Sequence, residues 1–143
     1  MEPIINTPRL VLARHLRMVL VSEAGPNQPI PAQLRYVASD PYAVALLLGD
    51  PARPTEWIFA RELLQEGLSE PSGDGDVRVW PFPGESGKAV LLIELVSPDG
   101  EALLEADPAE VQSFLTLTHE FVAGGEESAY FDIDGLIGAL LAA

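Results

Sequence analysis

Apolar and polar residues alternate along most of the chain with a period of two, which is the spacing of a half-buried β-strand. The alternation begins near the amino terminus, where Arg14 and Arg17 interrupt a run of apolar residues. Segments rich in glycine and proline separate one such run from the next. Alternation and turn residues predict strands at residues 9–21, 32–38, 42–48, 55–59 and 77–80. Residues 89–97 are almost wholly apolar and should form a central strand, and the tight turn after it predicts a hairpin partner at residues 101–106.

Residues 55–67 carry two conflicting signals. The Trp57-Ile-Phe59 run favours a strand, because β-branched and aromatic residues suit a pleated surface. The following run from Arg61 favours a helix, with Gly67 just past its end as a C-terminal cap. We therefore divide the segment into a short strand and a helix at about residues 60–67.

The clearest helix start lies at Asp107, which is followed by Pro108 and by Glu110 in a capping-box arrangement. It predicts a helix over residues 108–122, ended by Gly124-Gly125. After a strand-like Tyr130-Phe131, residues 132–143 are expected to form a third helix. Its apolar face would consist of Leu136, Ile137, Leu140 and Leu141.

This order of elements predicts the α+β class with antiparallel strands, because most connections are too short for helical crossovers. The length of 143 residues fits a single domain, at residues 9–143, after an N-terminal arm at residues 1–8. The edge of the long first strand and the apolar face of the last helix both need a cover. We expect self-association to cover one of them, and a closed ring does so economically.

The distribution of charge argues against a nucleic-acid-binding function. The net charge is −14, and no lysine or arginine follows Lys88, whereas eleven acidic residues do. A protein that binds nucleic acid needs basic side chains to displace the counterions of the phosphates. The acidic excess either keeps the chain soluble and separate or forms a docking face for a basic partner.

The chain contains no cysteine, which excludes disulfides, zinc–thiolate sites and thiol catalysis and fits a reducing cytoplasm. Arginines interrupt the hydrophobic run at the amino terminus, so no signal peptide is predicted. No segment approaches the roughly 20 apolar residues of a membrane-spanning helix. We expect a cytoplasmic protein that reaches a membrane only through protein partners.

Glycine-rich segments do not complete a catalytic or cofactor motif. Gly73-Asp-Gly75 lacks the third glycine of a dinucleotide fingerprint and precedes a strand instead of a helix. Gly84-Glu-Ser-Gly87 has Lys88 where a nucleophile elbow requires glycine. No catalytic residue and no cofactor are predicted.

Two other sets of residues invite a metal interpretation. Asp74 and Asp76 flow directly into a strand, and Asp132 and Asp134 suit a helix start, so no EF-hand calcium loop forms. The two histidines share no metal spacing and have no companion nucleophile, so we interpret them as structural. A positive charge on the second would be favourable near the end of its helix. These histidines are His15 and His119.

Aromatic residues on the short strands have two interpretations. Trp57, Phe59 and Trp80 could stack nucleobases, as they do in single-strand binders, but that function needs a basic groove beside them. Acidic residues accompany the nearby arginines. Core packing therefore explains these three residues better.

Three dense blocks between residues 34 and 81 resemble the SsgA-like proteins of sporulating actinomycetes, and the SsgB-like members most closely. The likeness covers about residues 10–140 and extends through the Ser97-Pro-Asp-Gly-Glu101 turn. The blocks are Leu34-Arg-Tyr with Asp40-Pro-Tyr-Ala-Val44, Glu56-Trp57 with Phe59-Ala-Arg61, and Gly75-Asp-Val-Arg-Val-Trp-Pro81.

The resemblance implies a β-barrel-like fold with helices, similar to the single-strand-binding Whirly proteins and arranged as a trimer. It also implies a protein without enzymatic activity that helps to mark septum sites in sporulation-specific division and recruits the tubulin-like protein FtsZ. Trp57, Arg61 and Asp99 are conspicuous in the similar blocks. Each has a structural explanation: core packing, pairing with a carboxylate and shaping a turn. The partner-binding surface is left unassigned.

Overall fold

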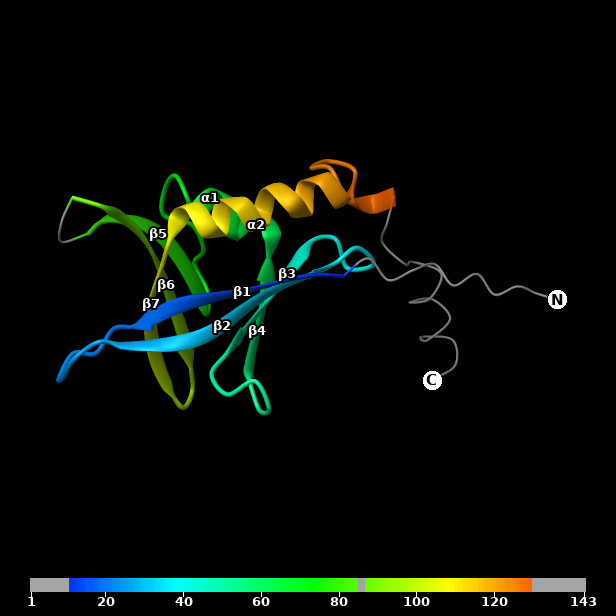
Figure 1. The fold of residues 1–143 in the computed structure, drawn as a ribbon. Coiled ribbons are helices and arrows are strands. Elements are labelled where there is room, and N and C mark those ends of the chain that lie inside the picture. Colours follow the sequence, from blue (N-terminus) through cyan, green and yellow to red (C-terminus); the bar gives the residue numbers. More distant parts are fainter. Residues whose placement is uncertain (1–10, 85–86, 130–143) are drawn as a thin grey trace.

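The computed structural model describes residues 11–84 and 87–129. Within these ranges the chain forms one antiparallel sheet of seven strands in the order β4-β3-β2-β1-β7-β6-β5. The sheet curls into a half-barrel, and both α-helices lie on the same side of it (Figure 1). The elements are β1 (Val11–Leu20), β2 (Gln28–Val37), β3 (Ala43–Leu48), β4 (Thr55–Ala60), α1 (Arg61–Gly67), β5 (Val77–Pro83), β6 (Ala89–Ser97), β7 (Gly100–Ala106), α2 (Pro108–Phe121) and a 3-10 turn at Glu127–Ala129.

The two-residue period decides which face of the sheet is buried. In β2, Ala32, Leu34 and Tyr36 are buried, while the residues between them are partly exposed. In β3, Val44 and Leu46 are buried in the same alternation. The helix α2 adds its own apolar face to this core, and the predicted α+β class with antiparallel strands is confirmed.

Two strands extend through prolines where the sequence predicts a stop. β2 begins at Gln28 and includes Pro29 and Pro31, and β5 continues through Pro81 to Pro83. Proline lacks a backbone N–H, so a strand tolerates it at positions where that N–H would not donate to a neighbouring strand. In β5 the backbone N–H and C=O groups of the odd-numbered residues point away from β6. This follows from Val79, which exchanges backbone hydrogen bonds with Ser72 on the side opposite β6. The prolines of β5 therefore lie on its outer edge and cost no bond to β6.

The first strand lies within the sheet order, and among the described residues only one of its two edges is paired along its whole length. β1 lies between β2 and β7 and pairs with β2 at all ten of its residues. Its pairing with β7 is limited to Val19 and Leu20, because β7 and β1 diverge where the sheet curls.

The division of residues 55–67 into a strand and a helix is confirmed, since β4 ends at Ala60 and α1 begins at Arg61. The predicted N-cap is also confirmed: the Asp107 carboxylate accepts a hydrogen bond of 2.8 Å from the Ala109 N–H. α2 ends at Phe121, before the two glycines. The predicted arm at residues 1–8, Tyr130-Phe131 and the third helix at residues 132–143 lie outside the described residues.

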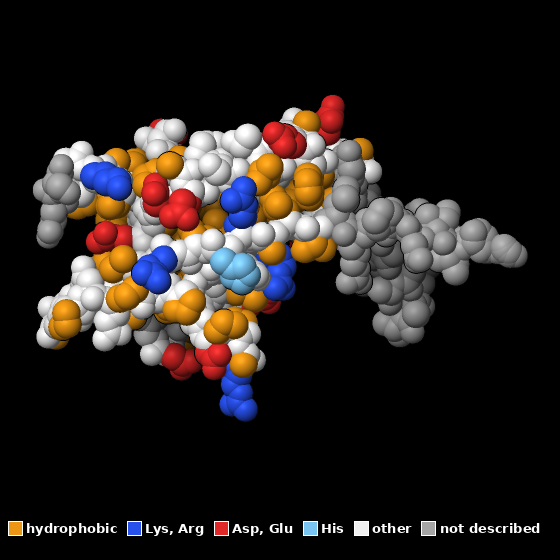
Figure 2. Space-filling view, viewed as in Figure 1, with side chains coloured by type: hydrophobic (Ala, Val, Ile, Leu, Met, Phe, Trp, Pro, Cys, Tyr) orange, Lys and Arg blue, Asp and Glu red, His pale blue; other side chains and the backbone are white. Residues whose placement is uncertain are grey.

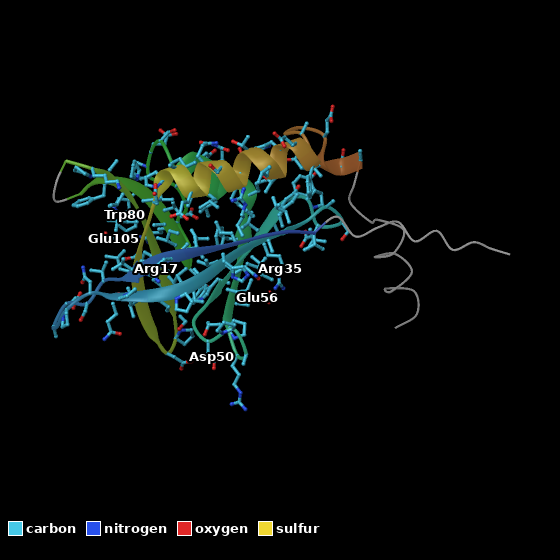
Figure 3. All side chains as sticks on the ribbon, viewed as in Figure 1. Arg17, Arg35, Asp50, Glu56, Trp80 and Glu105 are labelled. Carbon is cyan, nitrogen blue, oxygen red and sulfur yellow. The ribbon has the colours of Figure 1, made fainter. Side chains whose placement is uncertain are left out.

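The aromatic residues divide between the two faces of the sheet. Phe59 is buried in the core and Trp57 packs against it, as predicted. Trp80 is not a core residue, because even-numbered residues of β5 face outward. It lies opposite Leu92 on the outer face, where Leu92 is buried outside the core cluster. Figure 3 labels Trp80 on this part of the sheet.

Gly67 is the last residue of α1 and does not serve as a left-handed C-terminal cap, because its φ is not positive. A β-carbon on Gly67 would lie 2.6 Å from the Val79 Cβ, closer than real atoms approach. Glycine is therefore required here because α1 packs closely against β5, and the predicted capping role is wrong.

Replacing Gly67 with alanine should lower the free energy of unfolding by about 1–3 kcal/mol, because the added methyl group overpacks the contact with Val79. Urea denaturation followed by circular dichroism measures the change. The matched control is Gly75→Ala, since a β-carbon there meets no atom within 4 Å. Equal stabilities for the two variants would show that the close approach has no energetic weight.

Candidate functional site: the Arg61 cavity

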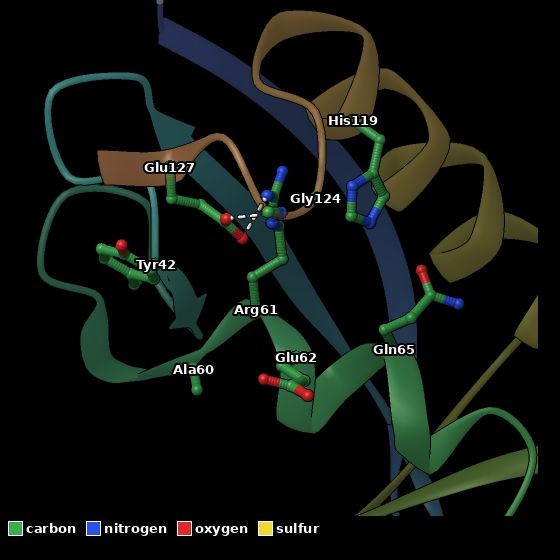
Figure 4. Close-up of a pocket in the computed structure, with 9 residues that line it drawn as sticks. Tyr42, Ala60, Arg61, Glu62, Gln65, His119, Gly124 and Glu127 are labelled. Atoms are coloured by element: carbon green, nitrogen blue, oxygen red, sulfur yellow. Dashed lines mark hydrogen bonds and ion pairs between the residues drawn. The ribbon is translucent and has the colours of Figure 1, made fainter. Parts of the chain in front are cut away.

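A cavity of about 440 Å³ lies where the junction of β4 and α1 meets the end of α2 and the turn that follows it (Figure 4). Its walls combine two carboxylates, one guanidinium and one imidazole with small and aromatic residues. The lining residues are Tyr42, Ala60, Arg61, Glu62, Gln65, His119, Gly124, Gly125 and Glu127.

Arg61 is placed by its position as the first residue of α1. Its backbone N–H donates to the Tyr42 carbonyl at 2.7 Å, which continues the pairing of β3 and β4 into the helix. Only 2% of the residue is exposed. The guanidinium therefore lies between the sheet and α2, and every hydrogen bond it makes must come from protein groups or water.

The guanidinium of Arg61 caps the carboxyl end of α2. Its Nη1 donates to the Thr118 carbonyl at 3.2 Å and to the Val122 carbonyl at 2.8 Å. The Thr118 carbonyl also accepts from the Val122 N–H at 2.9 Å. Carbonyls at the end of a helix carry partial negative charge, so a buried cation there is favourable. On another side, the guanidinium carbon lies 5.2 Å from the centre of the Tyr36 ring, close enough for a cation–π contact.

Glu127 compensates the charge of Arg61. Its Oε2 accepts from Arg61 Nη2 at 2.9 Å, and its Oε1 accepts from the Gly125 N–H at 2.8 Å. The hydrogen bond from Arg61 is the main reason why the pKa of Glu127 is lowered. Because the pair closes the chain on itself over 66 residues, it fixes the turn after α2 against the start of α1.

His119 does not supply the positive charge at the end of α2. Burial lowers its pKa most, and the charge of Arg61 lowers it further, against a smaller opposing effect of Glu127. The neutral imidazole is therefore favoured, and the expectation of a favourable positive charge on His119 is wrong. Arg61 occupies that electrostatic role, while His119 lines the cavity beside Gln65 (Figure 4).

The lining of the cavity offers polar groups beside a buried ion pair. Among the described residues that line it there is no serine, threonine or cysteine. The charge of Arg61 is matched by Glu127, and Glu62 leaves the lining net negative. Among residues 11–84 and 87–129, no cluster of acidic or histidine side chains could hold a metal ion.

The remaining residues singled out in the sequence lie apart from this cavity. Asp99 is exposed in the turn between β6 and β7, where its backbone N–H donates to Ser97 Oγ at 3.3 Å. His15 is exposed on β1, with its Nε2 3.2 Å from Gln33 Nε2. Asp76 precedes β5, and its carbonyl accepts from Val96, while Asp132 and Asp134 are outside the described residues.

Comparison with known proteins gives this fold a family. Residues 30–127 match the family described as Streptomyces sporulation and cell division protein, SsgA. The chain belongs to the SsgA family. The sporulation-specific cell division protein SsgB of Streptomyces coelicolor is 49% identical over 129 residues, which are 90% of this chain and 92% of that protein. SsgB of Kineococcus radiotolerans is 44% identical over 123 residues, 85% of this chain and 74% of that protein.

Two solved structures share the fold. One comes from work on SsgB mutations that correlate with longitudinal cell division during sporulation of Streptomyces coelicolor. It has a TM-score of 0.80 at 44% identity and covers 86% of this chain and 97% of its own. The other, an SsgA-like sporulation-specific cell division protein from Thermobifida fusca, has a TM-score of 0.82 at 35% identity, covering 94% and 98%. The resemblance found in the sequence is confirmed. These names support a role in cell division during sporulation and indicate no catalytic activity.

Replacing Arg61 with methionine should lower the free energy of unfolding by about 2–5 kcal/mol, because the Val122 carbonyl and Glu127 lose a buried donor and the Thr118 carbonyl loses one of its two. Arg61→Lys should restore part of the loss, since an ammonium cannot reach three acceptors as a guanidinium does. Urea denaturation is the measurement. Arg78→Met is the control: its 4.0 Å pair with Glu94 is exposed and should contribute less than about 1 kcal/mol. Equal losses in both methionine variants would contradict this account.

The protein should lose stability on acidification below the ordinary histidine value of 6.5, because His119 binds its proton less readily when folded than when unfolded. A second loss should follow below 4.5 as Glu127 takes up its proton. Denaturant titrations at successive pH values test this. His119→Gln should flatten the first decline and Glu127→Gln the second. A wild-type slope in His119→Gln would assign the first decline to other groups.

Proposed function

We propose that the protein is a non-enzymatic scaffold of sporulation-specific cell division that helps to position the septum. In this role it recruits or stabilises the FtsZ division ring through protein–protein contacts. The observation that carries the proposal is the 49% identity to the sporulation-specific cell division protein SsgB over 90% of this chain, because relatives so similar over a whole domain share the fold that shapes their surfaces.

The distribution of apolar residues supports contacts with other proteins. Ile58 is 62% exposed, and Val11, Tyr42 and Phe82 are each close to half exposed. Exposed apolar side chains that lie together on a surface mark sites of protein contact. We therefore propose a homotrimer that presents such residues to its own copies and to division proteins.

The same role accounts for localisation. Among the described residues, no helix is long and apolar enough to cross a membrane. We propose a cytoplasmic protein that reaches the septum, and through it the membrane, by contacts with protein partners. The Arg61 cavity would serve this role indirectly, since it holds the helices against the sheet and thereby fixes the shape of the outer surfaces.

A Whirly-like fold that binds single-stranded nucleic acid is the second candidate, and one observation favours it. Trp80 and Phe82 lie on the outward face of β5, where stacked bases could reach them. The neighbouring charge opposes it: Arg78 is paired with Glu94, and Glu101 and Glu105 lie on the same face of the sheet. Together with the net charge of −14, these acids would repel a phosphate backbone.

In size-exclusion chromatography with light scattering, the purified protein should have three times its chain mass of 15.4 kDa. It should also pellet with FtsZ polymers in a sedimentation assay and show no shift in the anisotropy of a labelled single-stranded oligonucleotide at low salt. A protein that stays in the supernatant when FtsZ polymers are pelleted would refute FtsZ recruitment. Oligonucleotide binding that weakens in a Trp80→Ala, Phe82→Ala double variant would favour the second candidate.

A further inference from the structure

β1 lies between β2 and β7 in the sheet, but its edge on the β7 side is largely unpaired among the described residues. The strand pairs with β2 from Val11 to Leu20, but with β7 only at Val19 and Leu20. On that side, residues 11–18 pair with no other strand among residues 11–84 and 87–129. This leaves a row of backbone donors and acceptors of the kind that accepts an added strand.

The register identifies which backbone groups face this edge. The Gly49 N–H donates to the Pro31 carbonyl. The backbone N–H and C=O groups of odd-numbered β2 residues therefore point toward β3, and those of even-numbered residues point toward β1. Even residues of β2 lie opposite even residues of β1. The N–H and C=O groups of Ala13, His15 and Arg17 therefore point away from β2, and all three residues are exposed.

Two hollows follow the same edge. One, of about 280 Å³, lies between Arg14 and the polar side of α2. The other, of about 220 Å³, lies between Arg17 and the segments that precede β6 and α2. The first is lined by Arg14, Gln112, Ser113, Thr116 and Leu117, and the second includes Arg17, Val19, Lys88, Glu105 and Asp107. Figure 3 labels Arg17 on β1 with Glu105 near it.

The charge at this edge is unlike that of the whole chain. Arg14 and Arg17 form no ion pair with any described residue, and of the described residues that line the first hollow only Arg14 is charged. In the second hollow, Glu105 and Asp107 balance Arg17 and Lys88, and Asp107 also caps α2. In a chain of net charge −14, the edge is thus locally neutral to positive. Figure 2 shows basic side chains interspersed with acidic ones on this face of the molecule.

The other strand edges are less suited to pairing. The outer edge of β5 carries Pro81 and Pro83, and Val79 is already bonded to Ser72 there. The outer edge of β4 is short and carries Glu56, which would repel an acidic segment. Among the described strands, β1 has the longest unpaired edge, and its two arginines form no ion pair with a described residue.

We propose that the open edge of β1 binds an extended, acidic segment of a protein partner by strand addition. Arg14 and Arg17 have opposite parity, so they lie on opposite faces of the strand. Two acidic residues three positions apart in the added strand would meet one arginine each. A second copy of this chain fits less well, because antiparallel pairing of two β1 edges would place arginines near arginines. The inference rests on the proposed scaffold function, in that it requires a protein partner.

The test uses the full chain and a labelled peptide of about eight residues, which matches residues 11–18 of β1. The peptide alternates valine and threonine with two glutamates three positions apart, and its matched control carries lysines instead. Fluorescence anisotropy should detect binding of the glutamate peptide alone. The Arg14→Glu variant should weaken binding by roughly tenfold. Arg53→Glu makes the same charge change in an exposed loop and should leave binding unaltered.

A second pair of variants tests the backbone contact. Ala13→Pro removes an N–H that faces the open edge without breaking a bond to β2, and it should weaken peptide binding by roughly tenfold. Ala13→Thr keeps the N–H and should bind as the wild type does. In hydrogen exchange, the amides of Ala13, His15 and Arg17 should exchange quickly in the free chain and slowly with the peptide.

Several results would overturn the inference. Wild-type binding by Ala13→Pro, or equal weakening by Arg14→Glu and Arg53→Glu, would exclude strand addition. Amides of Ala13, His15 and Arg17 already protected in the free chain would show that the edge is covered by another part of the chain. A lower oligomeric mass in Ala13→Pro would assign the edge to a second copy. FtsZ sedimentation run in parallel separates the two proposals, because FtsZ binding without peptide binding would retain the scaffold and reject this edge.

Discussion

The buried guanidinium of Arg61 is the interaction on which the arrangement of sheet and helices depends. It joins four parts of the chain: the Tyr36 ring of β2, the start of α1, the carbonyls at the end of α2 and the carboxylate of Glu127. A buried cation is costly unless hydrogen bonds and an opposite charge replace its water. Here hydrogen bonds and the opposite charge are both present. Arg61, whose burial alone would destabilise the fold, therefore holds α2 against the open side of the half-barrel.

That attachment matters because the sheet does not close on itself. β1 and β7 share only two paired positions, after which the two halves of the sheet diverge. α2 covers the core between them with Val111, Phe114 and Leu115. A helix can bury apolar side chains but cannot satisfy the backbone of a neighbouring strand, because its own amides are bonded within the helix. The half-barrel thus has a complete core and an incomplete ladder.

The sequence predicts local features better than distant ones. Alternation, apolar runs and turn residues placed the seven strands, and the Asp107 cap placed α2, because each signal lies within a few residues. The prolines in β2 and β5 led to wrong strand ends. A proline destabilises a strand only where its nitrogen faces a paired strand, and that direction follows from the register of the sheet, which the local sequence does not give. The role of Gly67 depends on Val79, which lies on another element. Arg61 was noticed, but its partner Glu127 is 66 residues away and no local pattern links them.

The use of the few basic residues connects this fold to its function. Arg61 is buried and paired with Glu127, and Arg78 forms a weak, exposed ion pair with Glu94. Arg14 and Arg17 lie on β1, one edge of which pairs with no other described strand from residue 11 to residue 18. Recognition by strand addition draws its affinity from main-chain hydrogen bonds, so a few charges suffice to select and orient the partner. Such a site needs no cluster of specialised side chains. It would therefore leave no catalytic or binding motif in the sequence, as is the case here.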